Sequence, residues 1–289
     1  MDINALRTHR SVIPFTKMQS DGNDYIFVEN FDGRVVCPES LCVNLCAPHT
    51  GIGADGIVLV ESSAVADAKM RSFNRDGSLG LMAGNNIRCV AKLLYDRGTV
   101  KKDRLTVETP AGVYALKLYL RNGKVSSVTV DLGRGRFAPE AIPTTLGGEE
   151  VLDRPLTVAG EEWRVSLVNV GNPHCVVFCE NIDSLPLAEI GPAFEKNEVF
   201  PERINTEFVR VVDRTTLRCR FWERGNGETL SCGTGAAAAV AAAVRLGLCP
   251  AGKDVTVHQA GGILTVNVTD GHVFLTGNAV KVFDGEFEY

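Results

Sequence analysis

The sequence predicts an α+β protein built from two pseudo-symmetric domains, each a mixed β-sheet wrapped around one central helix. Three observations predict this fold class: an internal repeat, short β-rich runs in both halves, and one mostly apolar helical segment in each half. The chain has 289 residues, which suits two domains of about 140 residues better than one core. We expect residues 1–130 plus 278–289 to form the first domain, and residues 131–277 to form the second.

The repeat is seen in glycine-led motifs. Residues 22–25 (GNDY) resemble residues 171–174 (GNPH), and residues 82–85 (MAGN) resemble residues 231–234 (SCGT), both at an offset of 149 positions. A loop at residues 73–77 (FNRDG) also repeats, at 221–225 (FWERG), with a slip of one residue. A shared offset near half the chain length predicts two similar domains that face each other about an approximate two-fold axis.

Turn-bounded runs of β-forming residues predict the strands. They lie at 25–28, 56–60, 105–107 and 125–130 in the first half, and at 163–168, 175–178, 207–212, 218–221, 262–268 and 272–276 in the second. Residues 86–95 and 235–246 have helical composition and are apolar nearly all round, which predicts buried helices. Only Arg88 and Lys92 interrupt the first of them. We expect residues 278–289 to cross back to the first domain.

Composition narrows the function. The sequence has no run of 18 apolar residues, so we expect no transmembrane helix. It has no apolar segment near the start, so we expect no signal peptide. A net charge of −5 without a basic stripe gives no reason to expect nucleic acid or a membrane as partner. Nine cysteines, an odd number, suggest reduced thiols in the cytoplasm. Cys42 and Cys46 are spaced for one helix face; we favour buried thiols in a small helix over half of a metal site, and expect no metal.

The two expected central helices begin at glycine-led turns, at residues 83–85 and 232–234. The first N–H groups of a helix lack internal partners, and the helix dipole there favours negative charge. Two such ends that meet would hold one carboxylate between them and would stabilise the charge that develops when an α-proton is removed. We expect Cys232 to have a lowered pKa there and to act as a base; a buried structural cysteine is the alternative.

At these residues the sequence resembles the diaminopimelate epimerase family. The matching segments run in order along nearly the whole chain: 15–18 with 22–24, 51–56, 73–78, 84–89, 171–175, 204–205 and 223–235. The resemblance implies a two-domain pseudo-symmetric fold and proton transfer without pyridoxal phosphate, another cofactor or metal. It also implies a cytoplasmic homodimer that acts on a small-molecule amino-acid substrate in the synthesis of lysine and peptidoglycan precursors.

The resemblance assigns roles residue by residue. Cys232 matches a catalytic acid/base. Gly84, Asn85, Gly233 and Thr234 match the positions that hold the reacting carboxylate, and Asn23, Asn74, Asn172, Asn205, Glu223 and Arg224 match substrate contacts. An arginine such as Arg224 can grip a distal carboxylate with two hydrogen bonds. His174 follows Pro173, and we interpret it as a strand-entry residue rather than a catalytic base.

The chain also departs from the family pattern. Ala83 stands where the family has its second catalytic cysteine, and Cys89 matches a separate family cysteine. Asn86 replaces a common glycine, and residues 47–49 differ from the usual turn. Three functions stay open: an epimerase of LL- and meso-diaminopimelate impaired by Ala83; a one-thiol racemase of another amino acid, such as histidine, with water or a nearby side chain as second base; and a catalytically dead amino-acid-binding protein. Diaminopimelate is the favoured ligand.

Overall fold

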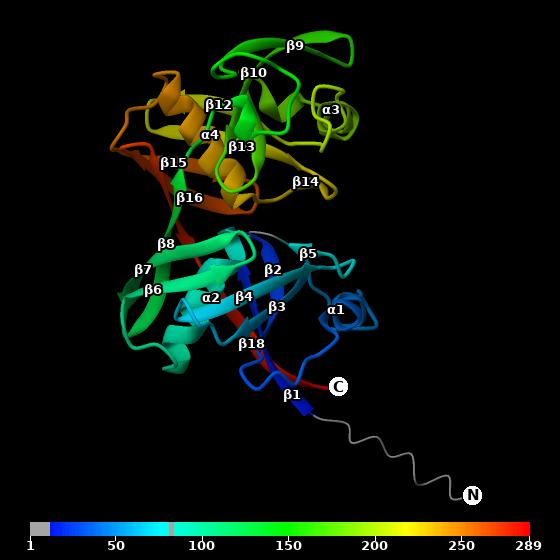
Figure 1. Ribbon diagram of the computed structural model, residues 1–289, viewed down its shortest axis with the longest axis vertical. Helices are drawn as coiled ribbons and strands as arrows, with labels where there is room; N and C mark the ends of the chain where they lie inside the picture. The colour runs from blue at the N-terminus through cyan, green and yellow to red at the C-terminus, as the bar shows by residue number, and fades with distance from the viewer. Residues whose placement is uncertain (1–11, 81–83) are drawn as a thin grey trace, which may run out of the picture.

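The computed structural model describes residues 12–80 and 84–289, so Ala83 lies outside the described residues. Two lobes are stacked along the long axis of the molecule, and each contains a sheet, a central helix and a second helix on its outer side (Figure 1). This is the predicted α+β architecture, and every strand and both central helices expected from the sequence are present. None of the helices in these two ranges is long and apolar enough to cross a membrane.

The elements of the first lobe are β1 (Val12–Ser20), β2 (Asn23–Glu29), α1 (Pro38–Cys46), β3 (Gly56–Glu61), β4 (Ala68–Asn74), β5 (Leu79–Gly80), α2 (Gly84–Arg97), β6 (Arg104–Thr109), β7 (Gly112–Arg121), β8 (Lys124–Arg134) and β18 (Val280–Glu288). Those of the second are β9 (Arg154–Val158), β10 (Glu161–Asn169), β11 (Pro173–Phe178), α3 (Leu187–Glu195), β12 (Asn205–Asp213), β13 (Thr216–Glu223), β14 (Gly227–Thr229), α4 (Gly233–Arg245), β15 (Asp254–Gln259), β16 (Gly262–Thr269) and β17 (His272–Asn278). Short 3₁₀ turns lie at Pro139–Ala141 and Ile182–Ser184.

Strand pairing follows the same plan in both lobes. The first sheet runs β18-β1-β2-β3-β4-β6-β7-β8 and the second runs β9-β10-β11-β12-β13-β15-β16-β17. Both are mixed, because β2–β3, β4–β6, β11–β12 and β13–β15 are parallel. β8 pairs with β17, with Val130 opposite Leu275, so the two sheets are continuous. The expected return of the chain is confirmed by the pairing of β18 with β1.

The register of the strands keeps the repeat at one offset. Val58 pairs with Ser72, and their counterparts 149 positions later, Glu207 and Phe221, pair in the same way. The predicted equivalence of residue 73 with residue 221 is therefore wrong within the strands. The turn that follows keeps the same offset, because the Gly77 N–H donates to Asn74 O and the Asn226 N–H donates to Glu223 O. The outer helices α1 and α3 also begin 149 positions apart, at Pro38 and Leu187, a similarity that their sequences do not reveal.

The central helices are buried as their composition predicts. Residues 236–243 of α4 are all at most 3% exposed, and their small side chains let the surrounding strands approach closely. In α2 polar residues are buried as well: Asn85 and Asn86 lie in its first turn, and Arg88 is fully buried. The expected thiols of α1 are confirmed: Cys42 and Cys46 are buried with their Sγ atoms 3.7 Å apart. Outside residues 1–11 and 81–83, no cluster of His, Cys, Asp and Glu has the arrangement of a metal site.

Candidate active site

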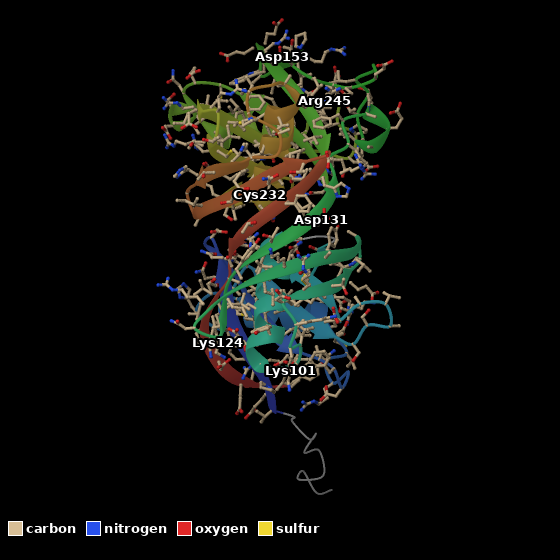
Figure 2. The ribbon with its side chains drawn as sticks, turned by 90° about the vertical axis from the view of Figure 1, so that its left-hand side faces the viewer. Lys101, Lys124, Asp131, Asp153, Cys232 and Arg245 are labelled. Carbon is tan, nitrogen blue, oxygen red and sulfur yellow. The ribbon has the colours of Figure 1, made fainter. Side chains whose placement is uncertain are left out.

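A cavity of about 950 Å³ lies between the lobes. Its lining includes every described residue that the sequence assigned to the site: Asn23, Asn74, Gly84, Asn85, Asn172, Asn205, Glu223, Arg224, Cys232, Gly233 and Thr234. Cys232 is labelled near the junction of the two lobes in Figure 2. Residues far apart in the chain therefore meet at one cavity, and both halves contribute to it.

The two central helices begin against each other. A Cβ on Gly84 would lie 3.7 Å from Cα of Gly233, and the Asn85 side chain donates a hydrogen bond to Ser231 Oγ at 3.0 Å. Glycine at these two positions leaves the backbone N–H groups of both helix starts accessible to a ligand. Two such ends provide unpaired donors and two positive dipole ends to a single carboxylate. The geometry expected from the sequence is present.

Arg88 holds the start of α2 in place. Its guanidinium donates to Gly84 O at 3.0 Å and to Asn85 Oδ1 at 2.9 Å. It also forms a fully buried ion pair of 2.9 Å with Asp21, at the end of β1. The residue does not line the cavity, but it fixes two groups that do.

Cys232 is the N-cap residue of α4. Its Sγ accepts a hydrogen bond from the backbone N–H of Gly235 at 3.3 Å and lies 3.6 Å from Thr234 Oγ1. The expectation of a lowered pKa is wrong. Burial raises the pKa of Cys232 well above its ordinary value, and the carboxylates of Glu223 and Glu207 raise it further, against the smaller effect of the two hydrogen-bonding groups. The resting group is therefore a thiol.

Behind the thiol lies a buried polar chain. His174 Nδ1 is 2.6 Å from Glu207 Oε1, and its Nε2 is 2.9 Å from Asn172 Oδ1. Pro173 begins β11, so His174 does sit at a strand entry as expected. Closer to the cavity, Glu223 accepts a hydrogen bond of 2.6 Å from Thr229. Burial raises the pKa of Glu223.

The polar side chains of the rim are braced by neighbours. Asn23 donates to Asp55 at 2.9 Å, and Asn74 donates to Ser78 at 3.0 Å. Asn205 is buried and accepts the backbone N–H of Arg224 at 2.9 Å. Its amide nitrogen donates to Pro173 O. Arg224 is partly exposed and uses one guanidinium N–H on the carbonyl of Glu202.

Sequence reasoning missed several residues around the cavity. Glu207 is hidden within an ordinary β12 strand, and the pairing register alone places it beside the cysteine helix. Tyr25 and Ser72 also line the cavity; the sequence places Tyr25 in a repeated motif and a strand, and assigns no element to Ser72. Arg88 could have been identified from the sequence. It is a charged residue on a helix that is apolar nearly all round, and a buried charge needs a buried partner.

The fold and the site together define a class of protein. Two similar lobes that present opposed helix starts and a thiol to a shared cavity are the arrangement of an isomerase that inverts a carbon centre by proton transfer. The model of the family described as "Diaminopimelate epimerase" matches residues 15–138 and 166–282. The chain belongs to the diaminopimelate epimerase family.

Relatives in sequence agree with this assignment, and a solved structure shares the fold. The chain is 47% identical over 276 residues to the diaminopimelate epimerase of Acetivibrio thermocellus. The aligned region covers 95% of this chain and 98% of that protein. The chain is 46% identical over 281 residues to the enzyme of the same name from Desulfovibrio desulfuricans, with 94% and 97% covered. Its fold is similar to that of a hydroxyproline epimerase from Agrobacterium vitis, with a TM-score of 0.71 at 16% identity and coverage of 96% and 92%.

Proposed function

We propose that this cavity binds diaminopimelate and that the chain interconverts its LL and meso forms by direct proton transfer, without a cofactor. The observation that supports this most is the convergence of all described site residues on one cavity at which two helix starts meet. The reacting carboxylate would lie between Gly84 and Gly233. The backbone N–H groups there would stabilise the negative charge that develops on it.

Cys232 would exchange the α-proton from the side of the second lobe. Asn23, Asn74, Asn172 and Asn205 would offer neutral donors and acceptors to the distal zwitterionic end. Glu223 would accept from an ammonium group, and Arg224 would bind the distal carboxylate through two N–H groups.

Ala83 would slow this reaction. Alanine has no exchangeable proton, and the repeat makes position 83 the counterpart of Cys232. General acid–base catalysis contributes about 10²–10⁴-fold to a rate, so we expect epimerisation that is slower by about that factor than with two thiols.

The test adds the missing thiol. Titration calorimetry should detect diaminopimelate binding to the unchanged chain, and Ala83→Cys should raise epimerisation by about 100-fold or more. Ala91→Cys, a buried alanine of the same helix, is the matched control and should leave the rate unchanged. Adding Cys232→Ala to Ala83→Cys should remove the gain. A chain that fails to bind diaminopimelate, and that stays inactive after Ala83→Cys, would have another function.

We also propose a cytoplasmic homodimer whose subunits divide into residues 1–130 plus 278–289 and residues 131–277. A catalytic thiol needs a reducing compartment, which supports the location. Val280, Val282 and Phe283 are each at least 40% exposed on β18, and a second copy of the chain would cover such an apolar strand. Val282→Asp should convert a dimer to a monomer in light scattering; a dimer unaffected by it would not use this face.

A further inference from the structure

The first lobe has a buried polar group at the cavity wall. Tyr25 and Ser72 line the cavity and are 7% and 4% exposed. Asn86, 1% exposed, donates from Nδ2 to Ser72 Oγ at 3.2 Å, and it lies near enough to Tyr25 to act against the burial that raises the pKa of the Tyr25 hydroxyl. Three polar side chains from β2, β4 and α2 therefore meet next to the helix start that lacks a thiol.

The second lobe has a different polar group at this place: the counterpart of Tyr25, 149 positions later, is His174, which is hydrogen-bonded to Glu207 and Asn172. The counterparts of Ser72 and Asn86, 149 positions later, are Phe221 and Gly235. A Cβ on Gly235 would lie 2.8 Å from Cδ1 of Phe221, so no side chain fits there. In the first lobe the small serine leaves the volume that the asparagine side chain occupies. Serine in place of phenylalanine makes space, and asparagine in place of glycine fills it. Together the two replacements add an amide to the first-lobe side of the cavity, where position 83 is alanine.

The Tyr25 ring also fits because a neighbouring residue is small. Its strand neighbour is Gly56, on which a Cβ would lie 2.5 Å from Cε1 of Tyr25. Burial raises the pKa of the Tyr25 hydroxyl, nearby Asp55, Glu223 and Cys42 act in the same direction, and the Asn86 side chain acts against them. The phenol is therefore protonated at rest and able to donate.

Tyr25 and Cys232 line one cavity from opposite lobes. Tyr25 belongs to β2 of the first lobe and Cys232 to the start of α4 in the second. Both line the same cavity, and the charge of Glu223 raises the pKa of both groups.

We propose that Tyr25 is the second proton-transfer group of this site, acting on the face of the α-carbon opposite Cys232, with Asn86 and Ser72 as positioning residues. The inference rests on the proposed function and deepens it. It supplies the exchangeable proton that Ala83 lacks.

The step balances without any further reagent. The Cys232 thiol first loses its proton to water. The resulting thiolate takes the α-proton, so the Cα–H bond breaks, an S–H bond forms, and the electron pair is delocalised into the carboxylate. The Tyr25 O–H bond then breaks as a new Cα–H bond forms on the other face. The tyrosinate is stabilised by the Asn86 N–H group. After the product leaves, the thiol proton returns to the tyrosinate through water.

The experiment compares Tyr25→Phe in two backgrounds. Diaminopimelate is incubated in D₂O; mass spectrometry follows deuterium at the α-carbon, and chiral chromatography follows inversion. In the unchanged chain, Tyr25→Phe should lower inversion by about 100-fold while exchange with retention, which needs Cys232 alone, continues within about threefold. In the Ala83→Cys background, which has its own second thiol, Tyr25→Phe should change inversion by less than about threefold. Tyr114→Phe removes a buried phenol away from the cavity and serves as control.

Each other outcome overturns the inference. Inversion that is unaffected by Tyr25→Phe would mean that the hydroxyl transfers no proton. An equal loss in both backgrounds would show a binding or structural role, and an unchanged chain that exchanges without inverting would show that it has no second group. In all three cases an active Ala83→Cys variant keeps the proposed function intact. An Ala83→Cys variant that neither binds nor epimerises diaminopimelate overturns the proposed function and the inference with it.

The positioning residues have a separate readout. Asn86→Gly removes the donor to the tyrosinate, so inversion should fall, and the loss of inversion at high pH, where the phenol ionises, should move to higher pH. Asp55, Glu223 and Cys42, the other groups that act on Tyr25, are unchanged in this variant. A lower rate with an unmoved pH profile would mean that Asn86 contributes only packing.

Discussion

Replacing Arg88 with methionine should destabilise the protein by about 3–5 kcal/mol. Methionine preserves the length of the side chain but none of its donors. The guanidinium is fully buried and donates to Ser20 Oγ, Asp21 Oδ2, Gly84 O, Asn85 Oδ1 and Asn278 O. The Asp21 carboxylate dominates the loss: it is fully buried, and its Oδ1 has no hydrogen-bond partner even with Arg88 present. Removing the arginine leaves an uncompensated buried charge.

Urea unfolding followed by circular dichroism measures this loss. The matched control is Arg97→Met on the same helix, because Arg97 pairs with Asp284 at 2.8 Å at the surface, where their side chains are 45% and 42% exposed. An exposed pair of this kind is worth at most about 1 kcal/mol. If the two variants lose similar stability, the reasoning about burial is refuted.

The pH dependence gives a second check with a definite sign. Burial already raises the pKa of Asp21 in the folded protein, and the loss of Arg88 should raise it further. The folded state then binds a proton more tightly than the unfolded chain, so stability falls as pH rises through the folded pKa. The deficit of Arg88→Met should therefore shrink from about pH 7 to about pH 5. A deficit that is constant over this range would contradict a buried charge.

Three further predictions concern Cys232 and its helix. Because the pKa of Cys232 is raised, α-proton exchange should increase with pH beyond the ordinary thiol pKa of about 8.5; a plateau already reached at about pH 7 would contradict this. Glu223→Gln removes a charge that raises this pKa, so alkylation of Cys232 by iodoacetamide, measured by peptide mass spectrometry, should begin at lower pH than in the unchanged chain. Gly235→Ala introduces a Cβ 2.8 Å from Glu207 Oε1 and should cost about 1–3 kcal/mol in urea unfolding; no loss would show that the helix shifts freely.

Much of the fold could be predicted because periodicity and repetition are local signals. The two central helices, the main strands and the crossing tail follow from them. Helix α3 escaped because it is short and contains Pro192, a residue that normally argues against a helix interior. The equivalence of α1 and α3 could not be predicted from their sequences either, because it becomes apparent only when the two lobes are aligned in the structure.

The residues of the site could be predicted from the sequence, but the pKa of the cysteine among them could not. The motifs placed Cys232 at a helix start, and this part is confirmed. Its pKa depends on burial and on Glu223 and Glu207, which reach the thiol from other strands. In the same way, the partnership of Ser72 with Asn86 becomes visible only when strand pairing shows that Phe221 occupies the equivalent volume in the other lobe.

The pairing of β18 with β1 sets the order in which the lobes are completed during synthesis. Thr16 and Asp284, which are hydrogen-bonded across this ladder at 2.8 Å, are 268 residues apart in the chain. At about 5–20 residues per second, β1 waits on the order of tens of seconds for its partner to leave the ribosome. The strands β9–β17 have all emerged by then. The lobe that is translated first is therefore closed last, and its open edge at Ile13 and Phe15 is the surface that nascent-chain chaperones would meet.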